Sequence, residues 1–297
     1  MKLKLKGAGG VYGRMLLPMF IILAVFTYAP LPQGIRLAFM RFSFFNMSQN
    51  RFNGIDNFVE IFSDTNVKFS RLVYNTFIWI IFSVAGQFIL GFTLALLLRK
   101  PFRGRGVYTA LVFYVWAMSA FVMGLTWSWL YNGQFGIIND VFQRFGFIKT
   151  PIGFLSNPNN ALPSVIVANI WMGIPFFGIM LLAALQSIPN ELYESAMLDG
   201  AGKIYQFIKV TVPYIQSTIT TTLLLRLIWT MNSAELIYGM TGGGPANATN
   251  TFAVEMINKT KALNYGRASA MGVIILIILF IFVNFYLRFV SKKEFKL

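Results

Sequence analysis

The sequence predicts an all-α, polytopic membrane protein with six transmembrane helices. Three observations lead to this prediction. Hydrophobic residues make up 56% of the 297 residues and charged residues only 12%, which is about half the charged share of a soluble domain. Apolar runs of about 20 residues, the length that crosses a bilayer as a helix, recur along the chain. Lys and Arg gather mostly in the segments between these runs.

The apolar runs predict six spans in order along the chain. The first follows a basic start and continues with Arg36 as its only charge, without a small-x-small cleavage site, so we expect an uncleaved helix rather than a signal peptide. The third ends with Trp127 and Trp129, which suit the membrane interface. The fifth begins at Pro213, because proline is favourable at the first position of a helix. The predicted spans are residues 15–34, 75–98, 106–130, 162–185, 213–238 and 268–287.

The distribution of basic residues predicts that both termini are cytoplasmic. Short tails and a short loop at the helix ends hold the densest group of Lys and Arg, and such groups stay on the cytoplasmic side. The chain then divides into a cytoplasmic tail (residues 1–14), a six-helix domain (15–287) with a cytoplasmic loop at 188–212, and a second cytoplasmic tail (288–297). We expect residues 41–72 to pack as an extracytoplasmic cap. The proposed cytoplasmic group is Lys2, Lys4, Lys6, Arg14, Arg99, Lys100, Arg103, Arg105, Lys203, Lys209, Arg288, Lys292, Lys293 and Lys296.

Composition also excludes several functions. The net charge of +15 does not indicate a nucleic-acid partner, because the basic residues lie mostly between apolar runs rather than on one polar face. The absence of Cys and His removes thiol nucleophiles, imidazole bases, most zinc sites and any disulfide. Asp56, Glu60 and Asp64 are the one acidic cluster outside the loop at 188–212, and a solvated loop explains them. We therefore expect a chain embedded in the lipid bilayer that is not an enzyme, with no catalytic, cofactor-binding or metal residues.

The loop at 188–212 predicts two short helices joined by a glycine bend. Pro189 closes the preceding helix, Asn190 is a suitable N-cap, and Gly200 suits a left-handed helix end. Leu192 with Ala196, and Tyr193 with Met197, repeat at helical spacing, so one face is apolar. This face has no evident partner in the chain. It could dock into a groove of another protein or rest on lipid headgroups, and the pattern leaves both open.

The same loop carries a motif. Glu194-Ser195-Ala196 followed by Asp199-Gly200-Ala201, with Pro213 further on, resembles the EAA loop of binding-protein-dependent ABC importer permeases. In that family the loop forms a coupling helix that fits a cleft of the cytoplasmic ATPase. The resemblance implies that Glu194, Ser195, Ala196, Asp199, Gly200 and Ala201 contact the ATPase. Ser195 departs from the usual alanine.

Three further stretches resemble the carbohydrate-uptake branch of that family, and the likeness covers about residues 15–287. The Gly-Gly-Pro sequence at Gly243-Gly244-Pro245 is similar to that of MalF-like subunits, and the tail at 291–297 lacks the ending of MalG-like ones. Ala234-Glu235 departs from a common Phe-Asp pair, which puts a substrate contact there in doubt. The stretches are Phe52 to Phe58 with Asn75-Thr76, Thr241 to Pro245, and Tyr265 to Ala270.

The resemblance implies a function and a set of partners. It implies a permease subunit that moves a carbohydrate, such as an oligosaccharide, across the bacterial cytoplasmic (inner) membrane as part of an ATP-driven importer. The partners would be a second, MalG-like permease, two ATP-binding cassette ATPases that bind ATP and Mg, and an extracytoplasmic solute-binding protein. This chain has no P-loop, since Gly202-Lys203 is followed by Ile204. We expect Gly242 to Gly244 to form a flexible outer loop.

The fifth span carries candidate residues of a substrate path: Arg226, Trp229, Asn232 and Glu235. Polar and charged groups at membrane depth usually face the interior of a bundle. At helical spacing Arg226, Trp229 and Ser233 share a face, with Asn232 to its side. An aromatic ring beside an amide suits sugar recognition. The alternative is that these residues join helices, with Arg226 bonded to backbone or to a carboxylate on a neighbour.

Two other functions remain as alternatives. An ion-coupled secondary carrier needs intramembrane carboxylates and often has repeated halves. Here Glu235 is the one carboxylate available, and no convincing repeat is present. An ABC importer for an acidic saccharide or a sugar phosphate would also suit the net charge of +15.

Overall fold

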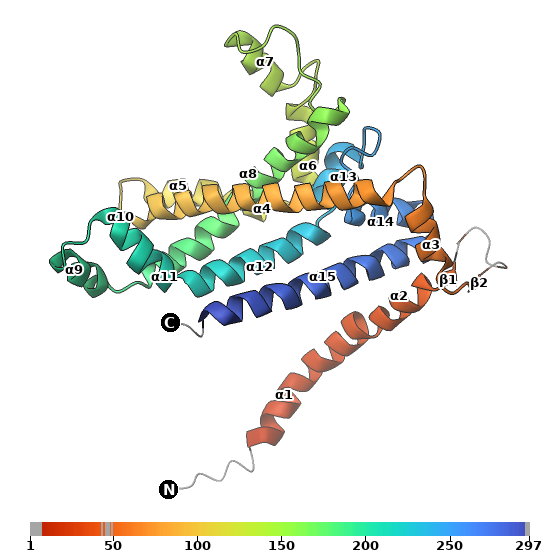
Figure 1. Ribbon diagram of the computed structural model, residues 1–297, viewed down its shortest axis with the longest axis horizontal. Coiled ribbons are helices and arrows are strands. Elements are labelled where there is room, and N and C mark those ends of the chain that lie inside the picture. The colour runs from red at the N-terminus through yellow and green to blue at the C-terminus, as the bar shows by residue number, and fades with distance from the viewer. Residues whose placement is uncertain (1–7, 43, 45–47, 49, 295–297) are drawn as a thin grey trace.

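A computed structural model describes residues 8–42, 44, 48 and 50–294, and these are predominantly helical (Figure 1). One two-residue antiparallel ladder pairs Met40 with Phe52. The elements in chain order are α1 (Ala8–Leu23), a π-helical turn (Ala24–Tyr28), α2 (Pro30–Ala38), β1 (Met40–Arg41), β2 (Arg51–Phe52), α3 (Asp56–Ser63), α4 (Phe69–Arg99), α5 (Arg105–Tyr114), a 3-10 turn (Val115–Ala117), α6 (Ala120–Leu130), α7 (Ile137–Arg144), α8 (Pro158–Gln186), α9 (Asn190–Leu198), α10 (Lys203–Gln206), a π-helical turn (Phe207–Thr211), α11 (Val212–Tyr214), α12 (Gln216–Asn232), α13 (Glu235–Thr241), α14 (Phe252–Lys261) and α15 (Tyr265–Glu294).

Four helical stretches within the described residues are long and apolar enough to cross a bilayer: Met15–Ala38, Phe69–Arg99, Pro158–Gln186 and Tyr265–Arg288. They correspond to the first, second, fourth and sixth predicted spans, and all four are longer than predicted. The second begins six residues before Asn75, so Asn75 and Thr76 lie inside the helix rather than at its start. Hydropathy underestimated these lengths, because residues with polar side chains at the helix ends still take part in the backbone hydrogen bonds of the helix.

The third predicted span is not one continuous helix. It consists of two helical pieces, Arg105–Ala117 and Ala120–Leu130, bent by 102°. Close packing of α6 on α13 accounts for the bend. A Cβ at Gly124 would lie 2.6 Å from the Leu236 carbonyl oxygen, and a Cβ at Gly239 would lie 2.8 Å from the Phe121 carbonyl oxygen. Glycine lets the two backbones meet at this distance, and α6 turns away from α5 to do so.

The fifth predicted span is also interrupted. Pro213 lies inside the short helix α11, and the main helix α12 begins at Gln216 and ends after 17 residues at Asn232. Ser233 then has an extended backbone with ψ 110°, and α13 follows. Seventeen residues fall short of the roughly 20 that cross a bilayer. The count of six spans and the cytoplasmic placement of both termini therefore stay predictions.

Figure 1 shows which elements gather at each end of the bundle. The end of α15 lies at the end of the bundle that also holds α9 and α10, whereas α1 runs away from the bundle and begins at a distance from it (Figure 1). The strands β1 and β2, helix α3 and the near end of α14 lie at the opposite end. Helix α1 diverges from the bundle, and the span Met15–Ala38 has no buried residue in its most apolar window. Its apolar surface is left for lipid or for another protein.

Helices α4 and α8 form the centre of the bundle. A Cβ at Gly91 of α4 would lie 2.5 Å from the Phe177 Cβ and 2.9 Å from the Ile174 carbonyl oxygen of α8. Such close approach of two helices is how membrane bundles gain packing energy where apolar surface alone gives no drive to associate. Phe176 and Phe177 are almost fully buried in the cluster that this contact creates.

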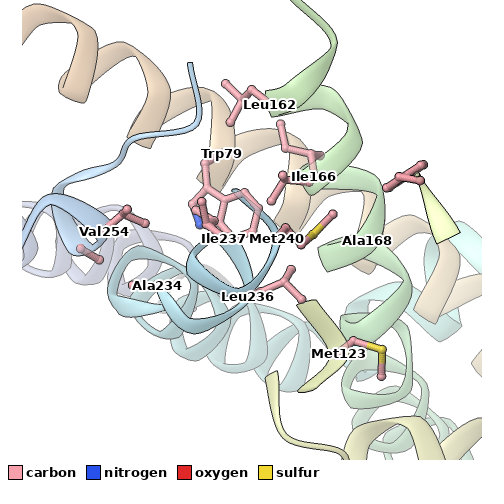
Figure 2. Packing of buried hydrophobic residues seen from close by; sticks show 13 residues of the cluster. Trp79, Met123, Leu162, Ile166, Ala168, Ala234, Leu236, Ile237, Met240 and Val254 are labelled. Carbon is pink, nitrogen blue, oxygen red and sulfur yellow. The ribbon is translucent and has the colours of Figure 1, made fainter. Parts of the chain in front are cut away.

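A second apolar cluster lies around Trp79, where α4, α8 and α13 meet. Figure 2 shows Trp79 beside Ile237 and Met240 of α13, with Ile166 of α8 close by. The Trp79 indole N–H donates to the carbonyl oxygen of Thr230 in α12 at 3.0 Å, so its polar edge is satisfied inside the protein. This cluster fixes α13 and the end of α12 against the central pair.

Residues 50–72 of the predicted cap are folded against neighbouring elements, whereas residues 43, 45–47 and 49 of that cap lie outside the described residues. The Asn57 side-chain amide donates to the carbonyl oxygens of Ala38 (2.8 Å) and Met40 (2.9 Å), which ties α3 to the end of α2. Arg267 at the start of α15 pairs with Glu60 of α3. The acidic group at Asp56, Glu60 and Asp64 is thus partly engaged in ion pairs rather than wholly solvated.

Candidate functional site

The loop at residues 188–212, which we name the coupling segment for the role that the resemblance implies, carries the motif. Pro189 has an extended backbone and α9 begins at Asn190, so Asn190 is the first helical residue and not the N-cap that the sequence predicted. Pro189 therefore takes the N-cap position, and no side chain caps the start of α9 from there. Glu191 lies in the first turn, where a negative charge stabilises the positive end of the helix.

Gly200 ends α9 as the sequence predicted. Its φ is +79°, in the left-handed region that favours glycine. The Ala201 N–H donates to the Ala196 carbonyl oxygen at 2.9 Å, and the Gly200 N–H donates to that of Met197 at 3.0 Å. These bonds close the helix and turn the chain toward α10. The predicted pair of short helices with a glycine bend is therefore present.

The outer surface of α9 is uncovered. The helix has no buried residue, and Leu198 is 90% exposed. The six motif residues are exposed or half-buried, and four of them line a surface hollow together with Tyr205: Ala196, Asp199, Gly200 and Ala201. Nothing in the described part of this chain covers this hollow. The apolar face of α9 is therefore available to a partner.

The helical spacing places Tyr193 on an apolar face without a partner in this chain, and for Tyr193 this prediction is wrong. Its ring packs against the α4–α8 cluster, and its hydroxyl is hydrogen-bonded to Arg99 and Thr211. Two features of the sequence could have revealed this contact. Tyr193 carries a hydroxyl on an otherwise apolar face, and Arg99 lies at the end of the second predicted span.

Arg226 lies inside the bundle rather than on an open path. It is 8% exposed, and its Nε donates to the Gln87 Oε1 of α4 at 2.5 Å. Gln87 in turn donates to the Asn169 carbonyl oxygen of α8 at 2.8 Å, and the guanidinium lies 5.7 Å from the Phe176 ring centre. The sequence had allowed backbone or a carboxylate as the partner of Arg226. The partner is instead the amide of Gln87, which sequence reasoning did not single out.

The other candidate path residues have different surroundings. Trp229 is 47% exposed and meets the Phe176 ring edge-on at 5.3 Å. Asn232 is exposed and donates to the Ile228 carbonyl oxygen of its own helix at 2.9 Å, and Glu235 is exposed in the first turn of α13. Ser233 lies outside the helix, so the shared helical face predicted for it is wrong. The structure exposes Trp229, Asn232 and Glu235 and buries Arg226.

The loop after α13 differs from the flexible loop predicted at Gly242 to Gly244, because the Thr249 N–H donates to the Gly243 carbonyl oxygen (3.2 Å) and the Thr249 hydroxyl donates to that of Gly244 (2.8 Å). Thr249, Asn250 and Thr251 are almost completely buried. The Asn75 side-chain amide donates to the carbonyl oxygens of Asn247 (2.9 Å) and Asn250 (2.8 Å). This loop is therefore packed into the fold, and the N–H groups of Gly242, Gly243 and Gly244 all donate within the chain. No group of three acidic side chains in the described residues could hold a metal ion.

Comparison with known proteins identifies the family. Residues 87–296 match the model of the binding-protein-dependent transport system inner membrane component. The chain belongs to this family. It is a permease subunit of the ABC importers, as the coupling segment had indicated, and the helical membrane fold is that of these permeases.

Individual relatives agree along nearly the whole chain. The trehalose/maltose transport system permease protein MalF of Thermococcus litoralis is 31% identical over 274 residues, which cover 92% of this chain and 91% of that protein. A crystal structure of a bacterial ABC transporter involved in the import of the acidic polysaccharide alginate contains a chain with a TM-score of 0.83 and 25% identity, over 97% of both chains. A second structure, of a bacterial alginate transporter in complex with an alginate pentasaccharide-bound periplasmic protein, contains a chain with a TM-score of 0.78 and 26% identity, over 95% of this chain and 94% of that one.

Proposed function

We propose that this permease moves an oligosaccharide from an extracytoplasmic binding protein into the bacterial cytoplasm. It would do so with a second, MalG-like permease and two ATPase subunits that bind ATP and Mg. The observation that carries the proposal is the uncovered helix α9, closed at Gly200 by a left-handed turn and exposed along its motif. An apolar surface of this kind on a helix outside the membrane fits a groove in another protein.

The mechanism follows from α9 as a rigid body. Binding of ATP would close the paired ATPases and carry α9 with them. If α9 contacts the open and closed ATPase states differently, each closure changes the balance between the two states of the membrane channel. Membership of the ABC permease family removes the ion-coupled carrier as an alternative, and with it the need for Glu235 to carry a proton.

Purification of the tagged chain from its native membrane in mild detergent tests the proposed partners. Mass spectrometry should find a P-loop ATPase and a second permease in the complex. If repeated gentle preparations contain neither, the proposed assembly is wrong.

The coupling role has a matched test at two glycines. Gly200 and Gly104 both have a left-handed φ, +79° and +88°, and neither has atoms near the place of a Cβ. Gly200→Val distorts the end of α9, whereas Gly104→Val makes the same change at the start of α5. We expect Gly200→Val, like Ala196→Asp, to keep the protein in the membrane but abolish ATP-driven uptake. Gly104→Val should retain uptake, and equal effects of the two valine variants would contradict a specific role of α9.

The charge of the substrate is a separate question. Relatives that are named for neutral and for acidic sugars both resemble this chain, so an acidic saccharide is the second candidate. Uptake of labelled maltose, trehalose, alginate oligosaccharides and glucose 6-phosphate into cells that carry the complete transporter separates these classes. Uptake of none of them, with the assembled complex present, would speak against the carbohydrate proposal.

A further inference from the structure

One side chain ties α9 to the membrane helices. Within the described residues, Tyr193 is the α9 residue whose side-chain hydrogen bonds reach other helices. All other side chains of α9 are exposed or half-buried without such a bond. The position of α9 relative to the bundle therefore depends on this residue and on the backbone at either end.

The Tyr193 hydroxyl is a meeting point of two membrane elements. Arg99, the last residue of α4, donates from Nη1 to this hydroxyl at 3.1 Å, and its guanidinium lies 4.7 Å from the centre of the ring. The hydroxyls of Tyr193 and Thr211 are 2.8 Å apart and hydrogen-bonded. Thr211 is 3% exposed and lies just before α11, in the segment that leads into α12.

We propose that Arg99, Tyr193 and Thr211 form a latch that transmits displacement of α9 to α4 and α12 together. This inference rests on the proposed coupling role of α9. The three are positioning residues, since they act through the helices that they join. A charge-assisted hydrogen bond holds its geometry better than a neutral one, so the Arg99 contact gives α9 a defined angle to α4.

Helix α4 has contacts that can pass the displacement onward. It is one uninterrupted helix of 31 residues. In its middle Gln87 accepts from the buried Arg226 of α12, and near its other end Asn75 holds the loop after α13. A movement imposed at Arg99 thus reaches both the interior of the bundle and the opposite end of the molecule.

A simpler role for Arg99 is to stabilise the end of α4, because a cation near a helix C-terminus interacts favourably with the helix dipole. That role concerns stability alone and does not need the Tyr193 hydroxyl.

The stabilising role and the latch are distinguished by substitutions that remove a hydroxyl and keep the shape of the side chain. Tyr193→Phe keeps the ring under Arg99, and Thr211→Val keeps the branched side chain. Thr211→Ser keeps the hydroxyl and removes only the methyl group.

The experiment uses the intact complex in lipid, with ATP, Mg and vanadate as the probe. This chain contains no cysteine, so spin labels can be attached at Tyr74→Cys in α4 and Thr126→Cys in α6, both exposed. The other chains are first made cysteine-free. The distance between the labels, measured by electron paramagnetic resonance as ATP is titrated, reports motion of α4 relative to an element outside the latch. Thermal unfolding of each variant is recorded as well.

We expect Tyr193→Phe and Thr211→Val to need about tenfold more ATP for half of the distance change, since a hydrogen bond to a charged or buried partner contributes about this factor or more to an equilibrium. Their unfolding midpoints should stay close to the original. Thr211→Ser should respond normally. Tyr238→Phe is the control, because its hydroxyl likewise accepts from a cation over its own ring (Lys261 Nζ, 2.6 Å) but joins α13 to α14, outside the coupling segment.

Two different results would overturn the latch. If Ala196→Asp abolishes the distance change while Tyr193→Phe and Thr211→Val respond like the original protein, α9 couples but the latch does not transmit. If Ala196→Asp itself responds normally, the coupling role of α9 fails and the latch fails with it.

Discussion

The coupling segment and the outer loop both connect predicted spans, but they differ in the burial of their polar groups. The outer loop is defined as residues 241–251. In the coupling segment, α9 buries none of its residues. In the outer loop, Thr249, Asn250 and Thr251 are almost fully buried. A buried polar group must find its hydrogen-bond partners within the chain, whereas an exposed one can leave them to water or to another protein. The difference therefore separates a segment that stabilises this chain from one that we propose is kept for a partner.

The outer loop meets this requirement with side chains from distant helices. Asn75 of α4 supplies two donors to the loop backbone. Asn250 donates to the Glu255 Oε2 at 2.7 Å, and Lys259 pairs with the Glu255 Oε1 at 3.0 Å. We expect substitutions here to reduce stability, and substitutions on the face of α9 to affect coupling with little effect on stability. The predictions below run from the largest expected effect to the smallest.

Replacement of Asn75 by alanine should have the largest effect. It removes both donors to the loop and so takes one partner from the part-buried carbonyl oxygen of Asn247 and one from the buried carbonyl oxygen of Asn250. We expect a loss of about 3 kcal/mol in the free energy of unfolding. Denaturant unfolding in detergent measures it. Asn284→Ala is the control, because Asn284 is exposed and bonds within its own helix. Equal losses in the two variants would remove the contrast.

Replacement of Glu255 by glutamine should have the second largest effect. Glu255 is 3% exposed and accepts from both Asn250 and Lys259, and the amide of glutamine can accept with only one of its two terminal atoms. We expect a loss of about 2 kcal/mol. Asp140→Asn makes the same change in a pair with Arg144 that is largely exposed, and should cost less than about 0.5 kcal/mol.

Acid should loosen the cap next to the outer loop. Burial opposes ionisation of the Asp64 carboxyl, but hydrogen bonds from the Val67 and Asn66 N–H groups and the charge of Lys259 outweigh it and lower its pKa below 3.8. A lowered pKa in the folded state contributes stability above the unfolded pKa, and this contribution is lost as the pH falls through the folded value. Unfolding midpoints should therefore fall below about pH 4, and less so in Asp64→Asn. Identical pH profiles would exclude this contribution.

Replacement of Leu198 by serine should have the smallest effect on stability. Leu198 is 90% exposed, so its removal exposes little new surface. We expect a change within about 0.5 kcal/mol, together with weaker retention of the ATPase during purification. A large loss of stability would mean that α9 packs on its own chain and is not kept for a partner.

Much of the architecture could be predicted from the sequence because its determinants are local. Runs of apolar residues locate helices whatever their neighbours are, and four spans appeared where hydropathy put them. Gly200 ends α9 in the left-handed conformation that its position in the motif indicated. The breaks in the third and fifth spans could not be predicted, because the contact of Gly124 with Gly239 joins segments more than a hundred residues apart.

The features of the candidate sites also divide into those that the sequence predicts and those that depend on tertiary packing. The sequence by itself determined the membrane class through its composition, the short helix that ends at Gly200 through short-range spacing, and the family through the resemblance of its loop to the EAA motif. Only the tertiary structure decided that Arg226 is buried against Gln87, that Asn75 orders the outer loop and that Tyr193 faces the bundle rather than a partner. The physical reason is that a polar side chain has many possible hydrogen-bond partners, and packing of distant helices selects among them.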